Sequence, residues 1–218
     1  MGNRHYFHNR HDAGTRLAEL LMDRGLIDEQ TTIIGLLRGG MPIAARIAIV
    51  SNSQLGALAV RKLGFPSEPE LAFGAIATYS HIHARYINEH LYASALQHDG
   101  EQAVAHAIEQ AQNQLQTLAS RFASYMPSIS RQRVIVCDDG LATGATMYAA
   151  IKVLKDLEAQ QISIAIPVAP AYLVNEFEAR GTQVTCLFTP EEFTAVGAYY
   201  KDFSQVDELE ILSMLSNF

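Results

Sequence analysis

Residues 134–146 read VIVCDDGLATGAT, and this stretch decides the fold that the sequence predicts. Its first four residues are apolar, and two carboxylates, Asp138 and Asp139, follow them directly. A loop of small residues comes next, and helical spacing of apolar residues begins at about residue 146. A continuously apolar strand that leads through small residues into a helix is typical of a parallel sheet covered by helices.

The same alternation of strand and helix extends outward from this stretch. Apolar runs predict five strands, at residues 32–37, 56–61, 133–137, 162–168 and 183–188. Helices are expected over residues 12–23, 42–50, 146–158 and 172–179, the first of them capped by Asp12. We therefore expect an α/β fold with a doubly wound, mainly parallel five-stranded sheet and helices on both faces. Between residues 78 and 130 the sheet pattern stops, and we expect a mobile loop followed by a long helix over 101–125.

Length and composition are consistent with one domain over residues 1–218, with its core at about 30–190. The chain is 49% hydrophobic and 18% charged, and its formal net charge is -7. An acidic balance argues against a broad nucleic-acid surface. Residues 1–14 lack an apolar signal core, and no run approaches the roughly 20 apolar residues of a membrane helix. We expect a soluble, cytoplasmic protein that binds neither nucleic acid nor membrane.

The loop after the acid pair has the chemistry of a phosphate site. Small residues let backbone N–H groups approach an anion closely, and the following helix adds its positive end. The paired acids suit the hydroxyl donors of a ribose and can help organise a hydrated Mg²⁺. The alternative is a helix-capping loop with two solvated acids. The predicted phosphate-binding residues are Ala142, Thr143, Gly144, Ala145 and Thr146.

This segment resembles the motif with which type I phosphoribosyltransferases bind 5-phosphoribosyl-1-pyrophosphate (PRPP). Gly140 departs from the motif, since an aliphatic residue is usual there. The chain is also similar over nearly its full length to a narrower group of mostly uncharacterised phosphoribosyltransferases. Their motifs have counterparts at residues 7–14, 38–40, 61–64, 70–75 and 196–203. The similarity is weak at residues 78–130, where the Arg-rich helix of those relatives is not found.

The resemblance implies a pyrophosphate site at the ends of the first two strands. Arg38, Gly39 and Gly40 end the first strand, where loops of the family often carry a cis non-proline peptide bond and bind pyrophosphate through backbone N–H groups. That bond is expected at Leu37–Arg38 or its neighbour. The alternative is a glycine turn with a solvated Arg38.

Arg61 and Lys62 end the second strand, in a run similar to that of adenine phosphoribosyltransferases. Two cations at a strand's carboxyl end can meet a pyrophosphate, and the alternative is a solvated basic turn. Neighbouring strand residues point to opposite sides, so the sequence does not rank the two.

A hood is expected from residues 1–25 and 190–218, by resemblance to hypoxanthine-guanine phosphoribosyltransferases. There Phe193 could stack on a flat base beside Tyr199, and Asp202 could assist Mg²⁺. The alternative for each residue is packing of the C-terminal segment.

Ala142 stands where oxopurine-specific enzymes of the family carry an Asp that handles the proton of the base. A general acid or base must then come from elsewhere, and Glu70 and Glu89 are candidates.

Two functions remain open at this point. The first is Mg²⁺-dependent transfer of 5-phosphoribosyl from PRPP to a nitrogenous base or related small-molecule acceptor, with release of pyrophosphate. The second is a non-catalytic PRPP or nucleotide sensor that acts through a protein partner. Either would belong to nucleotide metabolism, and a homodimer is left open. A nucleotide hydrolase or kinase is a weaker third choice, since the chain has no P-loop sequence.

Overall fold

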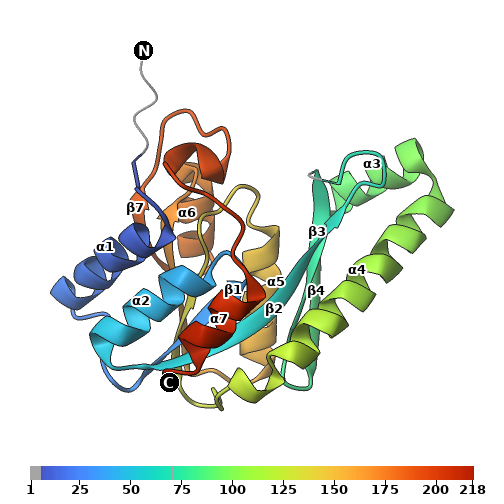
Figure 1. Ribbon diagram of the computed structural model, residues 1–218. Helices are drawn as coiled ribbons and strands as arrows, with labels where there is room; N and C mark the ends of the chain where they lie inside the picture. Colours follow the sequence, from blue (N-terminus) through green and yellow to red (C-terminus); the bar gives the residue numbers. More distant parts are fainter. Residues whose placement is uncertain (1–5, 70) are drawn as a thin grey trace. The chain divides into compact units, whose positions relative to one another are not determined.

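The computed structural model describes residues 6–69 and 71–218. Its strands form one seven-stranded sheet in the order β4-β3-β2-β1-β5-β6-β7, so the expectation of five strands was wrong (Figure 1). Internal contacts divide the chain into two compact units. Unit 1 comprises Met1–Ala57, Pro127–Ala142 and Glu158–Phe218, and unit 2 comprises Leu58–Met126 and Thr143–Leu157. Strand β2 (Gln54–Gly64) runs covalently from the first unit into the second.

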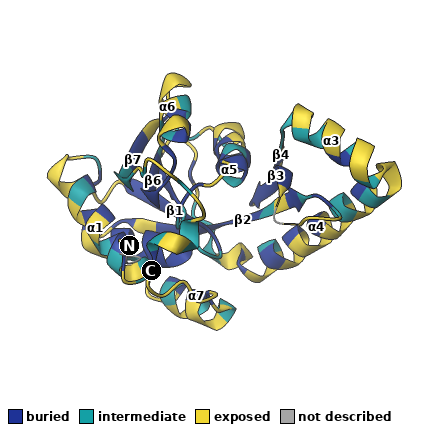
Figure 2. Cartoon of the chain, turned by 90° about the horizontal axis from the view of Figure 1, so that it is seen from above, coloured by how far each residue is buried: buried dark blue, intermediate teal, exposed yellow. Residues whose placement is uncertain are grey.

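Unit 1 contains four of the five strands that the sequence predicted, and the fifth, at residues 56–61, is part of β2. The four are β1 (Thr31–Leu37), β5 (Arg133–Cys137), β6 (Gln161–Val168) and β7 (Gln183–Phe188). All three pairings among them are parallel. Every residue of β1 is buried, and the unit's core strands are largely dark blue in Figure 2. The helices are α1 (Arg10–Asp23), α2 (Met41–Ser51), α6 (Ala171–Ala179) and α7 (Glu208–Leu215), with a short 3-10 turn at Val196–Tyr199.

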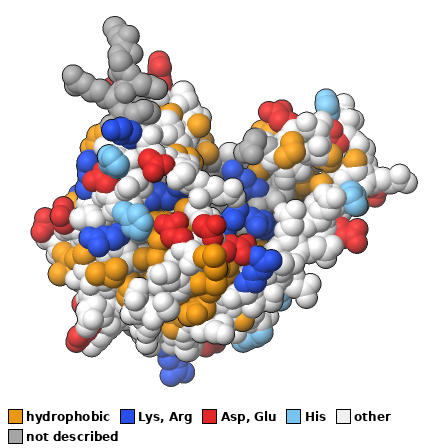
Figure 3. Space-filling model, in the orientation of Figure 1, with side chains coloured by type: hydrophobic (Ala, Val, Ile, Leu, Met, Phe, Trp, Pro, Cys, Tyr) orange, Lys and Arg blue, Asp and Glu red, His pale blue; other side chains and the backbone are white. Residues whose placement is uncertain are grey.

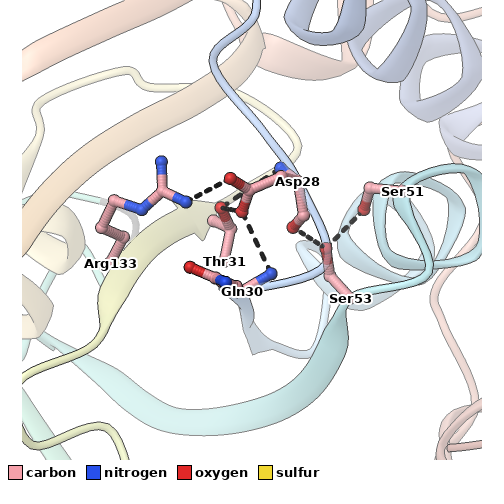
Figure 4. Close-up of polar contacts among 6 residues, drawn as sticks. All are labelled: Asp28, Gln30, Thr31, Ser51, Ser53 and Arg133. Carbon is pink, nitrogen blue, oxygen red and sulfur yellow. Dashed lines mark hydrogen bonds and ion pairs between the residues drawn. The ribbon is translucent and has the colours of Figure 1, made fainter.

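Polar contacts around Asp28 fix the amino ends of β1 and β5 (Figure 4). The Asp28 carboxylate accepts hydrogen bonds from the Arg133 guanidinium and from the Thr31 hydroxyl at 3.0 Å. The Arg133 hydrogen bond lowers the pKa of Asp28 from its usual value. Ser53 donates to the Asp28 carbonyl at 2.9 Å and lies 2.6 Å from Ser51 at the end of α2. These contacts tie two strands and a helix together at the edge opposite the strands' carboxyl ends.

Helix α1 begins earlier than the sequence predicted. Its N-cap is Asn9, whose side chain accepts from the Asp12 N–H at 3.0 Å, whereas Asp12 was expected to cap. Asp12 instead accepts from the backbone N–H of His8 at 2.9 Å, so the two side chains cap the helix together. Asp12 also pairs with Arg16 at 3.1 Å, and Figure 3 shows acidic and basic side chains interspersed on the side of unit 1 that carries α1.

Segments from both ends of the chain pair with each other just before α1. Phe7 forms a parallel bridge with Tyr200, and the Lys201 N–H donates to the Phe7 carbonyl at 2.9 Å. The Phe7 and Tyr200 rings lie 5.2 Å apart and both are buried. The predicted hood segments thus come together within unit 1.

Unit 2 corrects the prediction for residues 78–130. Strands β3 (Ala72–Tyr79) and β4 (Ile82–Ile87) form an antiparallel hairpin, and β3 also pairs with the end of β2. The hairpin turns at Ser80 with φ 54°, a backbone conformation usually taken by Gly or Asn, so the turn carries no strong sequence signal. The helices of the unit are α3 (Glu89–Asp99), α4 (Glu101–Arg121), the short turn Ala123–Tyr125, and α5 (Ala145–Asp156).

The expected helix over 101–125 is thus α4 with a short turn after it, preceded by an unpredicted helix, α3. The hydrophobic face of α4 consists of Val104, Ala111, Leu115 and Leu118. Within the described residues, no helix is both long and apolar enough to cross a membrane.

We predict that Gly14→Val destabilises unit 1. A Cβ at Gly14 would lie 3.0 Å from both the Arg46 Cβ and the Ile43 Cα, so helices α1 and α2 would have to separate. Overpacking of this kind costs about 1–3 kcal/mol. For a chain of this size each kcal/mol lowers Tm by roughly 2–4 °C, measurable by differential scanning calorimetry.

Glu19→Val is the matched control, because Glu19 lies on the exposed side of the same helix. It adds the same β-branched residue without the clash. Equal losses of Tm in the two variants would contradict close packing at Gly14.

Candidate functional site

The carboxyl ends of three strands meet in unit 1. Strand β1 pairs with β5 in a register that places Gly35 opposite Cys137, so residues 38–40 and the acid pair follow neighbouring strand ends. The Leu141 N–H donates to the Val168 carbonyl at the end of β6 at 3.0 Å. This edge is where open parallel sheets place ligands.

The glycine turn after β1 packs directly against the second acid. The Leu37–Arg38 peptide bond is cis, which confirms the bond predicted from the sequence. A Cβ on Gly39 would overlap the Asp139 carboxylate, and one on Gly40 would overlap the Cys137 carbonyl oxygen. Both glycines are therefore needed for this close approach, which brings together two groups that the sequence placed in separate motifs.

Arg10 is a site residue that the sequence analysis did not assign. Its Nε and Nη2 atoms lie 2.9 and 2.8 Å from Oδ2 of Asp139, and the two side chains are only 11% and 15% exposed. Its Nη1 donates to the Ser204 carbonyl at 2.8 Å, and its guanidinium lies 3.9 Å from the centre of the Phe203 ring. A partly buried arginine with this fixed geometry holds the carboxylate in one orientation and offsets its charge.

Tyr200 supports the acid pair through the backbone. Its buried hydroxyl donates to the Asp139 carbonyl at 2.6 Å. Burial, together with the negative charge of Asp139, raises the pKa of Tyr200 far above its usual value. The hydroxyl therefore keeps its proton and remains a donor. The only signals for Arg10 and Tyr200 in the sequence were their places in the motifs at residues 7–14 and 196–203.

Packing explains the departure at Gly140. A Cβ there would lie 2.7 Å from a Val196 methyl and 3.0 Å from a Val168 methyl. These valines occupy the space that an aliphatic side chain at this position would need.

The predicted phosphate loop continues into unit 2 after Ala142. Gly144 takes a left-handed conformation with φ 74° and forms the N-cap of α5. It has no side chain with which to cap, and the Ala145 N–H makes only a long 3.5 Å hydrogen bond to the Thr143 hydroxyl. Ala142 and Thr143 are exposed, and Thr146 is half-buried in the first helical turn. The start of α5 thus has the open N–H geometry that suits an anion.

Arg61 and Lys62 differ in burial within unit 2. Arg61 is half-buried opposite Ile76 of β3, and Lys62 is exposed opposite Ala75. The two side chains emerge on opposite faces of the sheet.

The hood residues form an aromatic cluster. Phe193 stacks on Tyr199 with ring centres 5.6 Å apart, and the Tyr199 hydroxyl donates to the Glu192 carbonyl at 3.0 Å. Asp202 is exposed and accepts from the Ser204 N–H at 3.0 Å, a bond that lowers the pKa of the Asp202 carboxyl. Ser204 links it to Arg10.

Of the two acid–base candidates, Glu89 alone lies within the described residues. Glu70 lies outside the described residues. Glu89 is the exposed first residue of α3 in unit 2.

The chain is an α/β protein with a cluster of polar groups at the carboxyl ends of its parallel strands. The family model of the phosphoribosyl transferase domain matches residues 6–176, and the chain belongs to this family. Two curated Mycobacterium tuberculosis proteins, from strains CDC 1551 and H37Rv, are each named "Putative phosphoribosyl transferase" and are 38% identical to the chain over 96% of its length. The alignments cover 46% of those proteins, so the chain spans about half their length.

Solved structures agree on the fold. TT1426 from Thermus thermophilus is 31% identical with a TM-score of 0.75, and the match covers 97% of this chain and 98% of that one. The AQ2163 protein from Aquifex aeolicus has a TM-score of 0.51 at 12% identity, covering 82% of this chain and 73% of that one.

We predict that Tyr200→Phe destabilises the protein by about 1–3 kcal/mol, because it leaves the Asp139 carbonyl without its buried donor. Urea unfolding measures the loss. Tyr199→Phe removes an equivalent hydroxyl whose bond is exposed, and its cost should stay below about 0.5 kcal/mol. A Tyr200→Phe variant as stable as Tyr199→Phe would show that the Tyr200 bond does not support the acid pair.

Proposed function

We propose that the chain transfers the 5-phosphoribosyl group of PRPP to a nitrogen nucleophile of a small acceptor and releases pyrophosphate. The observation that carries this proposal is the packing of the Gly39 turn against Asp139 at the carboxyl ends of β1 and β5. Membership of the phosphoribosyl transferase family supports the same reaction class.

The acid pair would hold the ribose. Carboxylate oxygens accept hydrogen bonds, and the two ribose hydroxyls are donors. Arg10 contacts Oδ2 of Asp139, and a carboxylate can accept several hydrogen bonds through its two oxygens. Asp138 Oδ1 accepts from the Asp139 N–H at 2.9 Å, which orders the two acids relative to each other.

The 5′-phosphate would bind the loop from Ala142 to Thr146. The left-handed Gly144 and the start of α5 present backbone N–H groups, and the hydroxyls of Thr143 and Thr146 add donors. Ala142 contributes backbone alone.

The leaving pyrophosphate would lie against the turn of Arg38, Gly39 and Gly40, with Arg61 and Lys62 as further cations. During the reaction the bond from the anomeric carbon to pyrophosphate breaks and a bond to nitrogen forms, so negative charge grows on pyrophosphate. The cations and the turn's backbone would stabilise that charge, although the Gly40 N–H already donates to the Leu36 carbonyl at 2.9 Å.

The carboxylate oxygens of the acid pair are suitable ligands for a Mg²⁺ ion that is held through bound water. Mg²⁺ prefers oxygen ligands and keeps several waters, usually with one or two carboxylates and the substrate phosphates. Arg10 already bonds to Oδ2 of Asp139, so a contact through water suits this carboxylate. When bound, the ion would neutralise charge on the pyrophosphate.

We predict that the double variant Asp138→Asn with Asp139→Asn weakens PRPP binding by roughly 10–100-fold, since hydrogen bonds to charged groups contribute about 1.5–3 kcal/mol. Isothermal titration with PRPP and Mg²⁺ measures the affinity. Asp156→Asn, at an exposed acid near the end of α5, is the control and should bind as the unmodified chain does. Unchanged affinity in the double variant would remove the ribose role of the acid pair.

We predict that Arg10→Gln weakens PRPP binding by roughly tenfold or more, because Asp139 loses its counter-charge near an anionic ligand. Arg16→Gln is the matched control on the same helix: Arg16 is exposed and its ion pair with Asp12 is worth little. The same titration compares them. Equal affinities in the two variants would show that Arg10 has no part in the site.

The alternative function is a non-catalytic PRPP sensor, which is favoured by the absence of an acid side chain at Ala142. A measurement of turnover distinguishes it from the transferase. Pyrophosphate release from PRPP and Mg²⁺ is screened against a panel of nitrogenous bases. Release that depends on one base supports the transferase. Tight PRPP binding without release for any base would favour the sensor.

A further inference from the structure

Unit 2 contains a groove that the proposed transferase function does not use. A cavity of about 650 Å³ lies between the β3–β4 hairpin and helix α4, which runs alongside the hairpin in Figure 1. This volume is within the roughly 300–1,000 Å³ of typical small-molecule sites. None of the twelve described residues that line it was assigned a role with PRPP.

The strand register shows which side of the hairpin forms the groove. Arg85 pairs with Ile76 and His83 pairs with Thr78, so these residues alternate along β3 and β4 and lie on one face. The other face is covered, because Tyr86 stacks on Tyr148 of α5 with ring centres 4.7 Å apart. The hairpin therefore packs closely on α5 and leaves a hollow toward α4.

The charge of the groove is opposite to that of the chain. The chain has a formal net charge of -7, yet none of the twelve described lining residues is acidic, and Arg85 is cationic. His83 is two residues away on the same strand, about 7 Å along it. A guanidinium and an imidazole at this spacing can share one phosphate or carboxylate.

Four polar side chains that line the groove are available to a ligand. Among residues 6–69 and 71–218, the side chains of His83, Arg85, Gln112 and Gln116 make no hydrogen bond or ion pair, and all four are exposed. By contrast, the Thr78 hydroxyl donates to the Ile82 carbonyl at 2.9 Å.

An apolar floor lies beside these polar groups. Ile76 and Leu115 are each 5% exposed and line the groove, with Ala119 next to them on α4. Much of α4 is white in Figure 3, because it carries few charged side chains. A flat ring can cover such a floor, and the amides of Gln112 and Gln116 can hydrogen-bond to its edge.

We propose that this groove binds a small ligand that carries one anionic group, a phosphate or a carboxylate, on a flat ring. Arg85 and His83 hold the anion, Ile76 and Leu115 contact the ring face, and a glutamine amide reads the ring edge. The site is independent of the proposed transferase function, since no residue is shared between the two.

Isothermal titration of the full chain tests the proposal with two anionic probes, adenosine 5′-monophosphate and 2-naphthoate. Their neutral counterparts are adenosine and naphthalene-2-carboxamide. We expect at least one anionic probe to bind, its neutral counterpart to bind roughly tenfold more weakly or worse, and Arg85→Gln with His83→Gln to weaken the anion by a similar factor. The preferred probe distinguishes a nucleotide from a ring carboxylate.

The control variant is Arg24→Gln with His90→Gln, which changes the same residue types at exposed positions outside the groove and should leave binding unchanged. Equal melting temperatures establish that both double variants are folded.

Three results would overturn the proposal. The first is that neither anionic probe binds at millimolar concentration. This result is expected if another copy of the chain covers the groove. Another is equal affinity for an anionic probe and its neutral counterpart. The third is binding that Asp138→Asn with Asp139→Asn removes and Arg85→Gln with His83→Gln does not, which would place the probe at the acid pair and leave the proposed transferase intact.

Discussion

The parallel pairing of β1 with β5 is the constraint on which the site in unit 1 depends. Because Gly35 lies opposite Cys137, the turn after one strand and the acid pair after the other emerge at the same edge. Gly39 can then pack against Asp139 only because it lacks a side chain. Arg10 approaches the same carboxylate from α1. A shift of one residue in this pairing would turn the side chains of the strand to the opposite face and separate these groups.

The local pattern of apolar residues was sufficient to predict the strands of the parallel core, but it did not predict the β3–β4 hairpin. Each predicted core strand is a short apolar run between helical segments, and the bounds of β5 and β7 matched the structure. Strands β3 and β4 were missed because Ser80 takes the left-handed turn position without the glycine or asparagine that would signal it. The cap of α1 was assigned to Asp12 although Asn9 is an equally good capping residue.

The sequence predicted those residues of the candidate site that come directly after a strand. The acid pair, the small loop and the turn at Arg38 could each be recognised within a few positions, and the cis bond at Leu37–Arg38 followed from resemblance. Arg10 and Tyr200 were not assigned because their contacts with Asp139 span 129 and 61 positions. The periodicity of apolar residues in a sequence indicates local structure only, so it does not reveal a contact between residues this far apart. Packing likewise accounts for the glycine at position 140, because two valines distant in the sequence fill the space that a side chain there would need.

The bond between Arg10 and Ser204 joins residues 194 positions apart. A ribosome completes α1 early, whereas the backbone carbonyl and the aromatic ring that hold its arginine are added much later. Contacts between such distant residues form slowly, because a long loop must close before they contribute. The guanidinium of a nascent chain can therefore meet Asp139 before it has its other partners. The surroundings of the acid pair stay incomplete in every nascent chain that stops before Ser204.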